Sequence, residues 1–106
     1  MNAKGGWREW TPLHYAALNG NKEIVELLIA KGADMNVTAN EEWTPLHTTA
    51  LEGNKEVVEL LIAKGVDVNA KDIDGKTPLN SAEGEIADLL RKHGGKTGAE
   101  LKAEGK

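Results

Sequence analysis

The sequence contains no cysteine, so neither a disulfide framework nor thiolate chemistry is available to it. It also lacks an apolar run approaching the roughly 18 residues of a membrane-spanning helix, and no span is predicted. Basic residues number 13 against 17 acidic ones, and a net charge of −4 argues against nucleic-acid binding, which needs a basic stripe. The first six residues are too short and polar for a signal peptide. We therefore expect a cytoplasmic protein, intracellular or recombinant.

Phenylalanine is absent as well, whereas three tryptophans and one tyrosine are present. A chain that builds its core from aromatic residues would normally use phenylalanine. Tryptophan and tyrosine combine an apolar ring with a polar atom, and protein interfaces favour them. The aromatic composition therefore points to a surface that contacts another molecule.

One phrase occurs three times at a constant spacing of 33 residues: Thr-Pro-Leu-His at 11–14 and 44–47, and Thr-Pro-Leu-Asn at 77–80. A fixed period of this length indicates a repeat array. Threonine is a good N-cap, and proline suits the first helical position because its missing N–H is not needed there. Each phrase therefore predicts the start of a helix.

The period and the Thr-Pro-Leu-His-x-x-Ala pattern resemble the ankyrin repeat, in which a β-turn finger precedes two antiparallel helices and a loop. Glycines 20 and 53 recur in frame, as do the apolar segments 24–28 and 57–61. The resemblance implies an all-α repeat solenoid, elongated and curved, forming a single domain over 1–106. We expect helices at 11–19, 22–31, 44–52 and 55–64. The expected units are repeat 1 at about 5–38, repeat 2 at about 39–71, a shortened C-terminal repeat at 72–95 and a tail at 96–106.

The two ends of the chain differ from its middle. The third repeat is four residues shorter than the second, close to one helical turn, which predicts a shortened first helix. In the tail, Thr97 and Glu100 have the spacing of a capping box and predict a short helix, although a disordered charged tail fits equally well. No capping repeat precedes repeat 1, so we expect an under-sealed N-terminal edge that frays, self-associates or is covered by a partner.

Sequence variation between the repeats is concentrated in the fingers and first helices, while the second helices are nearly identical. The resemblance implies that these variable parts line a concave binding face. Two fingers also lack favourable turn residues. Glu9 and Glu42 occupy the position of Gly75, where a left-handed backbone is expected, so either these glutamates are strained or the fingers take another shape.

We therefore predict a cluster of aromatic anchors with a polar rim, the usual anatomy of a protein interface. Alternatively, Trp10 and Trp43 pack on neighbouring fingers as structural residues. The predicted partner-binding residues are Trp7, Arg8, Trp10, Tyr15, Leu18, Asn19, Asn40, Glu41, Trp43, Thr48, Glu52, Asp74 and Lys76.

The histidines of the repeated phrase, His14 and His47, could suggest a metal site or catalysis. The third copy of the phrase has Asn80 there, which hydrogen-bonds but is a poor ligand for transition metals. In repeats of this type the histidine makes local hydrogen bonds that brace the finger. No nucleophile–base pair, phosphate loop or metal spacing occurs. We expect no cofactor, no metal and no enzymatic activity.

The sequence thus favours a non-enzymatic protein–protein interaction module that binds a folded protein, either natural or itself engineered, and neither nucleic acid nor membrane. Nearly identical second helices beside dissimilar, tryptophan-bearing fingers favour an engineered binder. The alternatives are a natural bacterial ankyrin-repeat adaptor fragment and a stability scaffold without a partner. Self-association is a further possibility.

Overall fold

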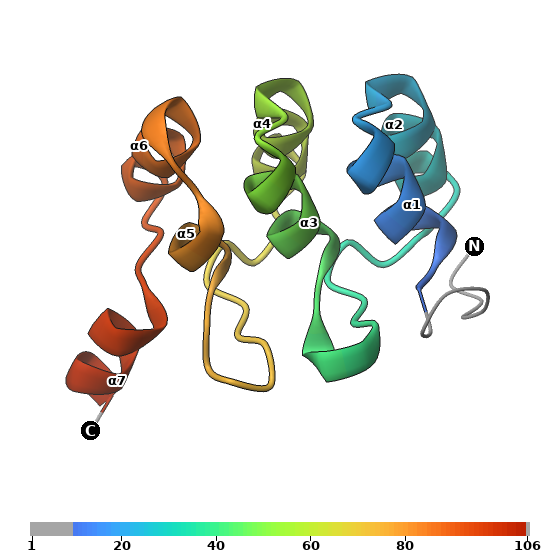
Figure 1. Ribbon diagram of the computed structural model, residues 1–106. Coiled ribbons are helices and arrows are strands. Elements are labelled where there is room, and N and C mark those ends of the chain that lie inside the picture. The colour runs from blue at the N-terminus through green and yellow to red at the C-terminus, as the bar shows by residue number, and fades with distance from the viewer. Residues whose placement is uncertain (1–9, 106) are drawn as a thin grey trace.

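The computed structural model describes residues 10–105, apart from the side chain of Asn40. Three helix pairs stack side by side along the longest dimension of a 36 × 25 × 20 Å body, and the loops between pairs project to one side (Figure 1). Within the described residues there are helices and no strands, and the predicted all-α repeat solenoid is confirmed. The helices are α1 (Pro12–Asn19), α2 (Lys22–Ala30), the short 3₁₀ helix η2 (Asn40–Glu42), α3 (Pro45–Glu52), α4 (Lys55–Ala63), α5 (Pro78–Ser81), α6 (Gly84–Lys92) and α7 (Gly98–Gly105).

The repeated phrase starts the first helix of each pair, as predicted. The Thr11 hydroxyl accepts a hydrogen bond from the His14 amide, and Thr44 does the same for His47. Each histidine ring in turn accepts a bond at Nδ1 from the amide of its capping threonine, at 3.2 Å in both repeats. Two of the free amides at each helix start are thereby satisfied.

Glycines end the first helices in the left-handed conformation, with φ of 69° at Gly20 and 77° at Gly53. Gly32, which follows α2, is also left-handed, with a φ of 99°. Gly20 has a second role, because a Cβ there would lie 2.2 Å from the side-chain nitrogen of Asn54. That asparagine caps α4 by accepting a bond from the Val57 amide. Gly20 therefore allows the second helix pair to approach the first.

We expect Gly20→Ala to destabilise the protein more than Gly53→Ala. Both substitutions place a side chain on a left-handed backbone, at about 1–2 kcal/mol each. Only at Gly20 must the new methyl group also displace Asn54 from its capping position, which adds about 1 kcal/mol. Urea denaturation of the two variants measures the difference, and equal losses would show that Asn54 moves without penalty.

The core runs through the stack between successive helix pairs. Leu13, Leu46 and Leu61 are fully buried, as are Val25 and Val58. The first helices α1, α3 and α5 contact one another in order, and so do the second helices α2, α4 and α6. Each pair therefore buries its apolar face only by packing on its neighbours, which is how repeat proteins gain stability.

The tail is ordered by the same contacts that join the repeats. Asn36 accepts a hydrogen bond from the Asp67 amide at 3.0 Å, and Asn69 accepts one from the Lys96 amide at 2.8 Å. The predicted capping box is confirmed, since Thr97 and Glu100 bond to each other's amides at 3.2 and 2.9 Å. Helix α7 consequently packs beside the last finger (Figure 1).

Candidate partner-binding site

Two fingers are described, finger 2 (39–43) and finger 3 (72–76). Each is closed by a backbone bond of 2.8 Å across its base, from Ala39 to the Trp43 carbonyl and from Asp72 to the Lys76 carbonyl. A further 2.8 Å bond joins the fingers, because the Ile73 amide donates to the Glu41 carbonyl. The fingers therefore form one connected row along the lower side of the stack (Figure 1).

The turn chemistry of the two fingers differs. In finger 3, the Asp72 carboxylate accepts bonds from the amides of Asp74 and Lys76, both at 2.9 Å, and Gly75 takes the left-handed position with φ of 79°. In finger 2, Ala39 offers no carboxylate, and both Glu41 and Glu42 have φ of 61°. The predicted left-handed Glu42 is confirmed, and Glu41 adds a second strained residue. Glu9 lies outside the described residues.

Replacing Glu42 by glycine should raise the free energy of unfolding by about 0.5–1 kcal/mol. Relief of the left-handed strain contributes about 1–2 kcal/mol, and the greater freedom of glycine in the unfolded chain offsets part of it. The matched control is Glu59→Gly on the exposed side of α4, which should lower stability by about 1 kcal/mol. Urea midpoints measure both, and a loss of stability at both positions would contradict the strain at Glu42.

The histidines make the predicted local bonds to their capping threonines, and in addition they reach the finger of the following repeat. His14 Nε2 lies 2.8 Å from the Trp43 carbonyl oxygen, and His47 Nε2 lies 3.0 Å from the Lys76 carbonyl oxygen. Each ring therefore links the start of one first helix to the base of the next finger. Burial lowers the pKa of His47, although its bond to the Lys76 carbonyl opposes the shift.

The lowered pKa of His47 predicts that acid weakens the fold. The unfolded chain binds a proton at His47 near pH 6.5, whereas the folded chain does so only at a lower pH. This contribution to stability is fully present above about pH 6.5 and is lost on acidification, by at most about 1.4 kcal/mol per pH unit. In His47→Asn the capping bond is retained, as Asn80 shows in the third repeat. Denaturation between pH 5 and 8 should give a shallower slope for the variant, and parallel slopes would contradict the assignment.

Both described tryptophans lie half-buried against the histidine of their own repeat. The Trp43 ring lies against the His47 ring with centroids 4.6 Å apart and planes tilted by 31°, and its indole nitrogen donates to the Thr48 hydroxyl at 2.9 Å. Trp10 lies 5.4 Å from the His14 ring and 5.3 Å from the Tyr15 ring. The indoles are thus held on the scaffold with part of each ring exposed.

Two residues of the predicted site, Thr48 and Tyr15, occupy the same repeat position but differ in burial. Thr48 is only 2 % exposed, because the first helix pair covers it, so it cannot contact a partner and instead orients the Trp43 indole. Tyr15 occupies the same position one repeat earlier, where it lines a hollow between α1 and α2 at the N-terminal edge. Its contact with Trp10 keeps it continuous with the aromatic cluster.

The polar residues of the predicted rim lie on the surface. Leu18 is also exposed, and two further apolar residues that the sequence reasoning missed, Leu51 and Ile73, are exposed to a greater extent. The exposure of Leu51 could have been predicted from the sequence, because Leu51 occupies the same repeat position as Leu18.

The side chains of three predicted site residues are not described. Trp7 and Arg8 lie outside the described residues, as does the side chain of Asn40. The exposed rim consists of Asn19, Glu41, Glu52, Asp74 and Lys76. We use the name finger face for the surface formed by Trp10, Leu18, Trp43, Leu51, Ile73 and this rim.

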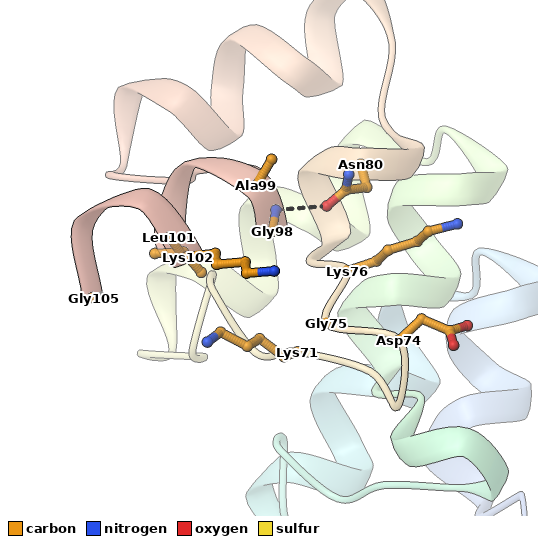
Figure 2. A pocket seen from close by; sticks show the side chains of 10 residues that line it. All are labelled: Lys71, Asp74, Gly75, Lys76, Asn80, Gly98, Ala99, Leu101, Lys102 and Gly105. Atoms are coloured by element: carbon orange, nitrogen blue, oxygen red, sulfur yellow. Dashed lines mark hydrogen bonds between the residues drawn. The ribbon is translucent and has the colours of Figure 1, made fainter.

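A groove of about 660 Å³ separates finger 3 from α7 (Figure 2). Lys71, Lys76 and Lys102 line it with Leu101, and the Gly98 amide at its edge donates to Asn80 Oδ1 at 2.9 Å. A Cβ at Gly98 would lie 2.0 Å from the Gly75 carbonyl oxygen, so only glycine permits this approach. Sequence reasoning missed the groove because it exists only when the tail docks on finger 3.

The described residues show neither a cluster of three potential metal ligands nor, between 10 and 105, a helix long and apolar enough to cross a membrane. A family model described as ankyrin repeats (3 copies) matches residues 1–39 and 13–103. No curated protein matches the chain.

Proposed function

Since this chain belongs to the ankyrin-repeat family, we propose that it is a non-enzymatic binding module whose finger face contacts a folded protein partner. Ankyrin repeats generally mediate protein–protein interaction and are typically not enzymes. The observation that supports the proposal most is the pair of half-exposed indoles, Trp10 and Trp43, each fixed on a buried histidine.

The geometry at Trp43 supports a role in binding because the ring is already ordered. Contact with His47 and the hydrogen bond to Thr48 restrict both torsions of the side chain. Immobilising a flexible side chain on binding opposes association by about 0.5–1.5 kcal/mol, and a fixed indole avoids this loss. Large aromatic side chains are also the commonest hot spots of protein interfaces.

The surroundings of the indoles support the same conclusion. Leu18 in α1, Leu51 in α3 and Ile73 in finger 3 add exposed apolar area, and Glu41, Glu52 and Lys76 add exposed charge. Apolar anchors inside a polar rim exclude water from the centre of an interface. We also propose that residues 1–106 act as one domain made of three repeats and a tail, because the tail is tied in by the bonds that join the repeats.

We further propose that the chain is an engineered binder. Helices α2 and α4 differ only at Ile24 and Val57, whereas fingers 2 and 3 share little. Finger 2 has also given up the carboxylate and glycine that make finger 3 a good turn, and it carries Trp43. When loops are selected to bind a partner rather than for stability, we expect nearly identical second helices beside fingers with unfavourable turn residues.

A second candidate, a stable scaffold without a partner, is favoured by one observation. The bond from Trp43 to Thr48 and the packing on His47 are contacts that a purely structural tryptophan would also make. In that case, loss of the indole would lower stability and change no interaction.

The test is a binding screen of the purified chain against an array of folded proteins. We expect at least one protein to be retained by the wild type and by the control Glu59→Ala, whose side chain is exposed on α4, away from the fingers. The same protein should be lost when Trp10 and Trp43 are both changed to alanine, provided that circular dichroism shows a folded variant. No retained protein, or retention that does not depend on either tryptophan, would contradict the proposal.

A further inference from the structure

We propose that the N-terminal edge of the stack is a second interaction surface, at which two copies of this chain form a symmetric dimer. This edge is the side of α1 and α2 that faces away from the rest of the stack (Figure 1). Pro12, Tyr15, Ile24 and Leu28 line a hollow there, and the exposed Leu27 lies on the same helix as Ile24. The edge is separate from the interaction assigned to the finger face.

The edge repeats a packing surface that is used inside the stack. Val57 is 0 % exposed and Leu60 is 8 % exposed, because α2 covers them. The matching residues of the first pair, Ile24 and Leu27, are 42 % and 52 % exposed. Nearly the same sequence is therefore a buried interface in α4 and an exposed apolar surface in α2, and exposed apolar patches favour association.

The edge is also hollowed. A depression of about 300 Å³ lies between α1 and α2, and it could receive an apolar side chain from a facing copy. Inside the stack, the equivalent side of the second pair, α3 and α4, is the one that packs against α1 and α2. The lining residues are Pro12, Tyr15, Ala16, Asn19, Asn21, Ile24 and Leu28.

The opposite end of the stack does not offer a matching apolar surface. The residues of α2 that face the next pair include Val25 and Ile29, and their counterparts in α6 are Ala87 and Arg91. Arg91 is exposed and pairs with Glu100 of the tail at 2.7 Å. Head-to-tail growth would place the apolar edge against this charged end. A closed, self-complementary contact between two N-terminal edges avoids that mismatch.

Charge along α2 fits a two-fold axis that passes close to Leu27. In an antiparallel pair of α2 helices centred there, a residue four positions before Leu27 meets one four positions after it. Glu23 of each copy then faces Lys31 of the other, and both side chains are exposed. The symmetry makes this pair twice. Such pairs contribute little affinity at a surface but select the orientation of the two copies.

The size of the edge predicts a weak dimer. The two shorter dimensions of the molecule, 25 and 20 Å, limit the edge to about 500 Å² per copy. Stable complexes usually bury about 800 Å² per partner, so we expect a dissociation constant on the order of tens of micromolar. The dimer should therefore form at high protein concentration and separate on dilution.

Sedimentation velocity of the full chain at about 5–500 µM tests the proposal. This range spans roughly tenfold on either side of the expected dissociation constant. The wild type should shift from monomer to dimer, and the double variant Ile24→Lys with Leu27→Lys should remain monomeric throughout. Leu51→Lys is the matched control, because Leu51 is equally apolar and exposed but lies on the finger face; it should dimerise like the wild type. A wild type that stays monomeric, or a dimer lost in the control instead, would overturn the proposal.

A charge exchange tests the orientation with substitutions at exposed positions. Glu23→Lys alone and Lys31→Glu alone should each weaken the dimer severalfold, since each places like charges opposite one another. The two changes together should restore dimerisation to the wild-type level. If the double exchange fails to restore the dimer, the antiparallel arrangement is excluded. This test does not depend on the double variant Ile24→Lys with Leu27→Lys remaining folded.

Discussion

Replacing Leu60 by alanine should lower the free energy of unfolding by about 2–4 kcal/mol, whereas the same change at Leu27 should lower it by less than about 1 kcal/mol. Both leucines occupy the same position in almost the same helical sequence, in α4 and in α2 respectively. Helix propensity therefore changes equally in the two variants. The difference isolates the contribution of the neighbouring helix pair, which covers Leu60 and leaves Leu27 exposed.

Urea denaturation at about 1–5 µM measures both effects below the concentration at which the proposed dimer forms. At such dilution Leu27 has no second copy to contact, and truncation removes little buried area. Raising the protein concentration should enlarge the effect of Leu27→Ala and leave that of Leu60→Ala unchanged. Equal losses at low concentration would mean that α2 is buried in some other way.

The comparison between Leu27 and Leu60 also marks the limit of what the sequence could predict. The helix starts followed from local chemistry, because Thr11 and Thr44 cap their helices through residues three positions away, and in the third repeat Asn80 accepts a bond from the Thr77 amide. The same is true of the capping box in the tail. Burial depends instead on which pair lies next in the stack, so two nearly identical helices, α2 and α4, have different environments.

The place of a repeat in the stack also explains why equivalent residues of the predicted site differ in burial. Tyr15 and Thr48 are equivalent in the repeat, yet one lines the open edge and the other is covered by α1. The bonds from His14 and His47 to the fingers span 29 residues each, so no local pattern could reveal them. The missing glycine left two alternatives for Glu42, strain or another finger shape, and nothing in the sequence indicated the second left-handed residue, Glu41, whose carbonyl accepts a bond from Ile73 in the next finger.

Trp43→Ala should weaken binding of a protein that contacts the finger face by at least about 2 kcal/mol, or roughly thirtyfold in dissociation constant. The substitution removes a large ring that is already ordered by His47 and Thr48, so the partner loses both contact area and a preformed surface. Calorimetric titration with a protein found in the array screen measures the loss. Thermal unfolding of the same variant separates binding from folding.

Thr48→Val provides the sharper comparison, because Thr48 is buried beneath the indole and cannot touch the partner. Valine keeps the shape of threonine but removes the hydroxyl that accepts the indole N–H at 2.9 Å. If the indole acts as a pre-oriented anchor, this variant should bind more weakly, by about 0.5–1.5 kcal/mol, with the whole ring still present. If Trp43 serves the fold alone, Thr48→Val should change stability and leave the affinity of the partner as it was. The structural and the binding roles of Trp43 thus predict opposite results at a buried residue that orients the indole.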